Sequence, residues 1–112
     1  MKRIAIFASG NGSNAENIIK YFQSNSKIKV DLIASNNPTA KVLTRIKSYS
    51  IPAIIFNKSH LNRGSLLEQL KIKKIDFIVL AGFLWKIPKQ IINSYSNKII
   101  NFYFVFLHLR II

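Results

Sequence analysis

Residues 3–15 read Arg-Ile-Ala-Ile-Phe-Ala-Ser-Gly-Asn-Gly-Ser-Asn-Ala, and this stretch decides the predicted fold. Its first six residues form an apolar run without polar alternation, which is typical of a strand buried on both faces of a parallel sheet. Gly10 and Gly12 then predict a tight turn. Residues 14–23 follow with apolar side chains at helical spacing, so the stretch predicts a strand, a glycine-rich turn and a helix.

The rest of the chain repeats this alternation. Further strands are predicted over residues 28–35, 51–56, 76–81 and 98–102, and further helices over 40–48, 63–73 and 88–94, with a loop over 57–62. Alternating strands and helices predict an α/β fold, in which a mostly parallel sheet carries helices on both faces. Ligands of such sheets bind at the carboxyl ends of the strands, which here lead into 9–14, 35–37, 82–87 and the residues after 100.

Length and composition limit the classes of protein to consider. The chain has 112 residues, 49% of them hydrophobic, so we expect one compact domain. It has no cysteine, which excludes a disulfide framework and cysteine-based metal sites, and we expect no metal. No apolar stretch reaches the ~18 residues of a membrane span, so we expect a cytoplasmic protein without membrane association.

The net charge of +13 invites a nucleic-acid interpretation. However, Ile, Lys and Asn number 20, 13 and 11, and all three have A/T-rich codons, so codon bias explains the lysine excess. The lysines are scattered, and the densest cluster, at 71–74, has no interleaved aromatic side chains for base stacking. We therefore do not expect nucleic acid to be the partner.

The glycine-rich turn predicts a phosphate site. Residues 10–15 fit the pattern G-x-G-x-x-G/A between a strand and a helix, where free N–H groups and the helix dipole favour an anion. A plain tight turn with Asn14 as the helix cap is the alternative. A dinucleotide would need an acidic residue at the end of the second strand, but that strand ends in Ser35 and Asp31 lies inside it. A single phosphate on a smaller ligand is therefore favoured.

A second candidate site follows the fourth predicted strand. Residues 80–88 form an apolar loop that contains Phe83 and Trp85. Exposed loop backbone beside apolar side chains is suited to a flat heteroaromatic ring, which it packs against and hydrogen-bonds. The alternative is a hydrophobic corner between a strand and a helix, and the residues alone leave both open.

Four motifs together resemble a known family. Residues 9–14 (Ser-Gly-Asn-Gly-Ser-Asn), 35–36 (Ser-Asn), 79–83 (Val-Leu-Ala-Gly-Phe) and 99–101 (Ile-Ile-Asn) occur in the same order and spacing in phosphoribosylglycinamide formyltransferases. The resemblance covers residues 1–101. It implies a Rossmann-like formyltransferase fold and a one-carbon transferase of purine biosynthesis. Its co-substrate would be 10-formyltetrahydrofolate, and its formyl acceptor the amine of glycinamide ribonucleotide.

The resemblance also implies roles for individual residues. Gly12, Ser13 and Asn14 would bind the phosphate of the ribonucleotide. Asn101 would be catalytic, donating hydrogen bonds to the formyl oxygen as it becomes an oxyanion. The residues implied in folate binding are Arg63, Leu84, Trp85, Lys86, Ile87 and Asn101.

The sequence departs from the family after Asn101. The family has a catalytic His two residues on, where this chain has Tyr103, and the catalytic Asp belongs to a C-terminal half beyond the resemblance. We therefore expect a formyltransferase N-terminal domain over 1–101, an aberrant apolar tail over 102–112 that a frameshift would explain, and inactive or impaired catalysis. The alternatives are a small basic nucleotide- or RNA-binding module without catalysis and another formyltetrahydrofolate-using member of the family. The sequence predicts no oligomeric state.

Overall fold

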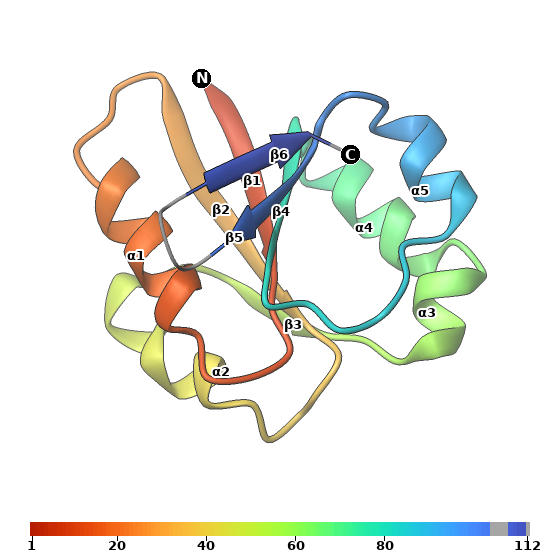
Figure 1. The fold of residues 1–112 in the computed structure, drawn as a ribbon, viewed down its shortest axis with the longest axis horizontal. Helices are drawn as coiled ribbons and strands as arrows, with labels where there is room; N and C mark the ends of the chain where they lie inside the picture. The colour runs from red at the N-terminus through yellow and green to blue at the C-terminus, as the bar shows by residue number, and fades with distance from the viewer. Residues whose placement is uncertain (104–107, 112) are drawn as a thin grey trace.

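The chain folds around one twisted sheet with helices on both faces (Figure 1). The computed structural model describes residues 1–103 and 108–111. Within them the six strands lie in the order β3-β2-β1-β4-β5-β6. Strands β1 to β5 are parallel to one another, and β6 runs antiparallel to β5. The strands are β1 (Lys2–Phe7), β2 (Ile28–Ser35), β3 (Ala53–Ile55), β4 (Phe77–Ala81), β5 (Ile99–Tyr103) and β6 (His108–Ile111).

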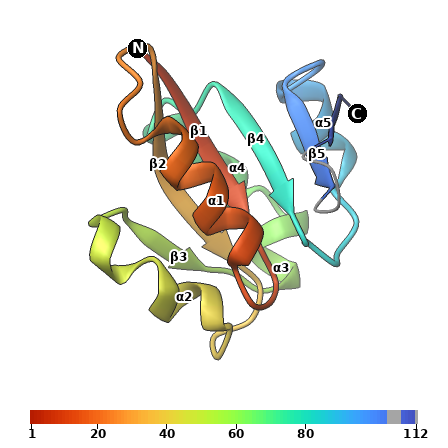
Figure 2. The ribbon, with the colours of Figure 1, turned by 60° about the vertical axis from the view of Figure 1, so that its left-hand side comes forward.

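The helices divide between the two faces of the sheet. Helices α1 and α2 lie on one side, and α3, α4 and α5 lie on the other (Figures 1 and 2). Their bounds are α1 (Ser13–Phe22), α2 (Lys41–Arg45), the short 3-10 helix η1 (Lys47–Tyr49), α3 (Lys58–Asn62), α4 (Ser65–Ile72) and α5 (Lys89–Ser94). The predicted α/β class, with a mostly parallel sheet, is confirmed.

Strand β1 explains why the sheet needs helices on both sides. Ile6 and Phe7 are both fully buried, and they belong to separate apolar cores on opposite faces of the sheet. A strand that is central and covered twice has no polar face, which is why its sequence lacks alternation. β1 therefore holds the glycine-rich turn on a rigid support.

The predicted loop over 57–62 is wrong, because residues 58–62 form helix α3. Asn57 Oδ1 accepts a hydrogen bond from the backbone N–H of His60 (2.9 Å), and His60 Nδ1 accepts one from the backbone N–H of Asn57 (3.0 Å). This is a capping box in which His takes the place of the usual Glu or Gln. The predicted helix over 40–48 divides into α2 and η1, and Ser50 ends the segment with a φ of +57°.

The backbone continues as a strand past residue 101. Strand β5 extends to Tyr103, and Asn101 lies opposite Arg110 of β6. Residues 104–107 and 112 of the expected aberrant tail lie outside the described residues, and the interpretation of 102–112 stays a prediction. In the described part of the chain, none of the helices has the length and apolarity needed to span a membrane.

Candidate functional site

The candidate site lies where the carboxyl ends of the central strands meet. The strand register aligns Ala34, Phe7, Leu80 and Asn101 in one row across β2, β1, β4 and β5. Asn101 is therefore level with the last residue of β1, just before the glycine-rich turn. The topology thus brings together three segments that are far apart in sequence: the turn, the Gly82–Ile87 loop and Asn101.

Gly12 shapes the glycine-rich turn. It is the residue before α1, with a φ of +87°, and no side chain caps the helix, so Asn14 is not the cap. A Cβ on Gly12 would lie 2.6 Å from the Cα, Cβ and Cγ2 atoms of Val42 on α2. Both the positive φ and this close approach require glycine at position 12.

The first turn of α1 presents polar atoms to the candidate site. The backbone N–H of Ser13 donates to Asn11 Oδ1 (3.1 Å), whereas those of Asn14 and Ala15 have no acceptor among the described residues. Asn14 Oδ1 is buried and accepts no hydrogen bond there, and the same holds for Asn36 Oδ1 after β2. Because buried polar atoms are normally paired, these groups identify a surface suited to a polar ligand.

Ser9 joins the turn to the second candidate loop. It is buried directly after β1, and its Oγ accepts a hydrogen bond from the backbone N–H of Leu84 (3.0 Å). Sequence reasoning placed Ser9 in the family motif 9–14 but missed this link. A serine directly after a buried strand was the available signal.

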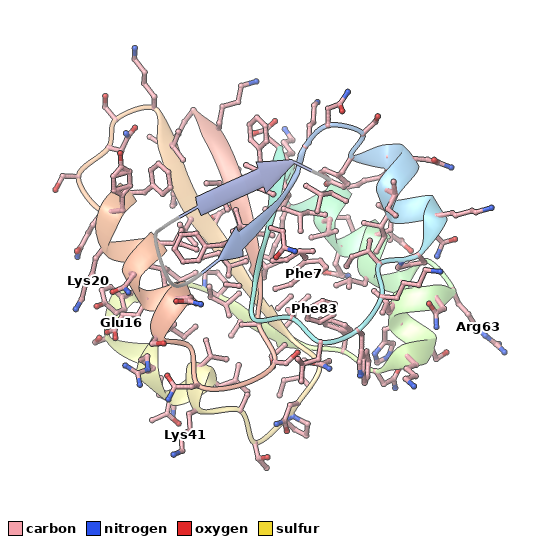
Figure 3. All side chains as sticks on the ribbon, in the orientation of Figure 1. Phe7, Glu16, Lys20, Lys41, Arg63 and Phe83 are labelled. Carbon is pink, nitrogen blue, oxygen red and sulfur yellow. The ribbon has the colours of Figure 1, made fainter. Side chains whose placement is uncertain are left out.

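The Gly82–Ile87 loop is held by aromatic contacts. The ring of Phe83 lies 5.5 Å from that of Phe7 and 5.8 Å from that of Phe56. Figure 3 shows Phe7 of β1 beside Phe83 of the loop. The ring of Trp85 lies 6.2 Å from Phe56. Lys58 Nζ on α3 stands 5.4 Å from the centre of the Trp85 ring, a cation–π contact.

The four predicted folate residues of this loop differ in exposure. Ile87 is buried in the core and Lys86 is exposed, while Trp85 is half-buried. Leu84 is 82% exposed. The loop is thus a hydrophobic corner at Phe83 and Ile87 that leaves Leu84 exposed and Trp85 half-buried, and its role as a ring-binding site stays a prediction.

Arg63 lies at the edge of the site. Arg63 is the C-cap residue of α3, and its side chain points outward from the molecule (Figure 3). Helix α3 itself lies beside the apolar loop, because Lys58 of α3 contacts Trp85. It is also joined to α5, where Gln90 Nε2 donates a hydrogen bond to the carbonyl oxygen of Asn62 (2.8 Å). The structure therefore brings the helix, and not the guanidinium, against the loop.

Asn101 is half-buried on β5 and takes part in an interaction within the structure. It lies two residues after Ile99, which packs in the same core as Phe7 and Leu80. Since side chains alternate along a strand, Asn101 faces the side of the sheet that carries α3 to α5. Tyr103 is the last residue of β5.

Asp31 lies inside strand β2 and away from the candidate site. Its carboxylate forms ion pairs with Arg3 (3.4 Å) and Lys29 (3.5 Å), far from the carboxyl end of β2. A groove of about 510 Å³ lies at the amino end of β2, between α1, β2 and residues 49–52. In the described ranges, no cluster of three or more His, Cys, Asp or Glu side chains is placed to hold a metal ion.

Comparison with known proteins decides the family. A family model described as formyl transferase matches residues 2–107. The chain belongs to the formyl transferase family. The phosphoribosylglycinamide formyltransferase of Bacillus subtilis is 36% identical in an alignment of 107 positions that covers 90% of this chain and 55% of that protein.

Solved structures of the family share the fold. The glycinamide ribonucleotide transformylase 1 of Geobacillus kaustophilus superposes with a TM-score of 0.81 at 33% identity, over 90% of this chain and 57% of that one. The phosphoribosylglycinamide formyltransferase of Bacillus halodurans gives 0.79 at 37% identity, over 89% and 55%. The Rossmann-like formyltransferase fold is confirmed, and the chain spans about half the length of the relatives that it matches. The roles of individual residues stay predictions.

Proposed function

We propose that this chain is the substrate-binding portion of a phosphoribosylglycinamide formyltransferase of purine biosynthesis. The observation that supports this most is the convergence of the glycine-rich turn, the Gly82–Ile87 loop and Asn101 at one sheet edge. The hydrogen bond between Ser9 and Leu84 joins the first two. Both substrates are small and water-soluble, so the proposal includes a cytoplasmic location.

The phosphate of glycinamide ribonucleotide would bind at Gly12, Ser13 and Asn14. The unpaired N–H groups at the start of α1 point along the helix axis, where the dipole favours an anion. The half-buried side chain of Asn14, with its buried and unpaired Oδ1, adds an amide group to this site. Glu16, the acidic residue of the first turn, is engaged by Arg45 and Tyr49 and is therefore partly neutralised.

The co-substrate 10-formyltetrahydrofolate would bind along residues 84–87. Its pterin ring would pack on the exposed apolar surface of Leu84 and Trp85, and backbone groups of the loop, including that of Lys86, would hydrogen-bond its edge. Ile87 would support the loop from the core. Arg63 is exposed at the rim, where its cation is free to meet an acidic end of the folate.

The chemistry needs an oxyanion donor and a route for a proton. The substrate amine attacks the formyl carbon, the formyl oxygen becomes an oxyanion that accepts a hydrogen bond from the Asn101 side-chain amide, and the bond to the folate nitrogen breaks as that nitrogen takes a proton. Tyr103 stands where the family has its His, and a phenol with a pKa of about 10 is a poor proton carrier at neutral pH. We therefore propose that the 112-residue chain binds its substrates and transfers formyl groups little or not at all.

Calorimetry and a transfer assay test this proposal together. The purified chain is titrated with glycinamide ribonucleotide and, separately, with a formyl-folate analogue that cannot transfer; formyl transfer is then followed with both true substrates. We expect saturable binding of the ribonucleotide, competition by inorganic phosphate, and turnover at least a thousandfold below that of a full-length relative. Absence of ribonucleotide binding would refute the assignment, and turnover equal to the relative's would refute the role given to the missing His. Binding of the folate analogue alone would favour another formyltetrahydrofolate-using member of the family.

A further inference from the structure

Arg45 connects helix α2 to the glycine-rich turn through two hydrogen bonds and to helix α1 through a third. Its Nε donates to the carbonyl oxygen of Asn11 and its Nη2 to Asn11 Oδ1, each at 3.1 Å. Its Nη1 donates to Glu16 Oε1, also at 3.1 Å, across an ion pair. A guanidinium is planar with its donors in a fixed fork, so these bonds fix both the position and the direction of Asn11.

Asn11 passes this constraint to the start of α1. Its Oδ1, held by Arg45, also accepts the hydrogen bond from the backbone N–H of Ser13 (3.1 Å). The backbone N–H of Val42 holds the carbonyl oxygen of Gly10 (3.0 Å) on the other side. Helix α2 thus holds Gly10 and Asn11, the two residues before Gly12, and Gly12 itself approaches Val42 too closely for any side chain.

Glu16 completes the network. Its second oxygen, Oε2, accepts a hydrogen bond from the Tyr49 hydroxyl at 2.8 Å. The hydrogen bond from Tyr49, followed by that from Arg45, holds the pKa of Glu16 below its usual value, so the carboxylate is ionised at neutral pH. Figure 3 shows Glu16 on the part of α1 that faces α2. Arg45 therefore has a permanent counter-charge on α1 that helps to hold its guanidinium beside the turn.

We propose that Arg45 is a positioning residue that holds the turn 10–13 in the conformation that binds the ribonucleotide phosphate. This inference rests on the proposed function for the identity of the ligand. Arg45 acts through Asn11 and Ser13, by fixing the direction of the backbone N–H groups at the start of α1. A positive charge at position 45 without these hydrogen bonds is not sufficient for full phosphate affinity. A lysine has no planar fork and does not bridge both atoms of Asn11 and Glu16.

The experiment compares Arg45→Met and Arg45→Lys with Lys47→Met, which removes the same charge from an exposed position in η1. Calorimetry with glycinamide ribonucleotide is expected to show about tenfold weaker binding for both Arg45 variants and less than twofold change for Lys47→Met. Affinity for the formyl-folate analogue is expected to stay within twofold in all three. Full affinity in Arg45→Lys would overturn the proposal, because charge alone would then suffice. Equal loss for both ligands would also overturn it, because Arg45 would then act on the fold as a whole.

Amide hydrogen exchange without ligand separates this inference from the proposed function. The Ser13 amide is expected to exchange several times faster in Arg45→Met than in the wild type, with no change at Ser65 at the start of α4. Unchanged exchange at Ser13 would overturn the positioning role even if ribonucleotide binding weakens, because Arg45 would then contact the phosphate directly.

If Arg45→Met does not fold, Tyr49→Phe, which removes one hydroxyl, is expected to change exchange and affinity in the same direction by two- to threefold. If the wild type does not bind the ribonucleotide, the proposed function fails and exchange at Ser13 alone decides the role of Arg45.

Discussion

The two loops of the candidate site are held in place by different forces. The glycine-rich turn is fixed by polar bonds and by one steric requirement: Arg45 and Val42 hydrogen-bond it, and Gly12 packs against α2. The Gly82–Ile87 loop is fixed by aromatic packing of Phe83 and Trp85, and it leaves Leu84 exposed. The first arrangement is suited to an anion, which needs hydrogen-bond donors at fixed positions. The second is suited to a flat apolar ring. Only the Ser9–Leu84 hydrogen bond among those described links the two.

The largest expected effect comes from the steric requirement of the turn. Gly12→Ala is expected to lower the free energy of unfolding by about 3 kcal/mol. The loss is expected because residue 12 has a positive φ and because the new Cβ would lie 2.6 Å from the Val42 Cα. Gly64→Ala is the matched control, because Gly64 also has a positive φ (+97°) but nothing lies within 4 Å of its Cβ position. It is expected to cost about 1 kcal/mol. Chemical denaturation measures both, and equal losses would show that packing against α2 does not constrain the turn.

The next effect concerns the aromatic loop. Trp85→Leu is expected to weaken binding of the formyl-folate analogue about tenfold, because the large ring face is lost, and to leave ribonucleotide affinity unchanged. Trp85 is the one tryptophan of the chain, so quenching of its fluorescence reports binding in the wild type. Tyr21→Leu, at an aromatic position of α1 that is 78% exposed, serves as the control. Equal weakening for both ligands would remove the distinction between the loops.

Breaking the link between the loops is expected to have a smaller effect. Ser9→Ala leaves the backbone N–H of Leu84 without its acceptor, and the free energy of unfolding is expected to fall by about 1 kcal/mol. Affinity for the folate analogue is expected to fall with it, since Leu84 loses its anchor. Ser24→Ala, at an exposed position after α1, is the control. A change in ribonucleotide affinity alone in Ser9→Ala would contradict the role of Ser9 as the anchor of the Gly82–Ile87 loop.

The smallest effect is a pH dependence of the network behind the turn. The pKa of Glu16 is lowered first by the hydrogen bond from Tyr49 and then by that from Arg45, and the pKa of Tyr49 is raised mainly by its bond to Glu16. A lowered carboxyl pKa contributes stability above its unfolded value, and that contribution disappears as pH falls through the folded pKa. The stability difference between the wild type and Tyr49→Phe should therefore be present at pH 7 and vanish in acid. It should also vanish at alkaline pH above the raised pKa of Tyr49. Denaturation across this range tests it, and a difference independent of pH would contradict the assignment.

The sequence predicted the five parallel strands and the positions of both loops because each depends on a local pattern, but it did not predict strand β6. Buried strands without alternation, such as residues 3–8, and glycines after a strand are visible in the chain itself. Helix α3 was missed because its capping box uses His60, which the usual sequence pattern does not include. The roles of Arg45 and Val42 were missed because they depend on the packing of α2 against a turn 30 residues earlier, which no local pattern encodes.

Titration of the isotope-labelled chain with glycinamide ribonucleotide, followed by amide NMR, tests the central claim most directly. The account predicts the largest, saturable shifts at the backbone amides of Gly12 to Ala15 at the start of α1, smaller ones around Asn101, and reversal by excess inorganic phosphate. Shifts confined to other segments, such as the groove between α1, β2 and residues 49–52, or the absence of saturable shifts, would contradict it.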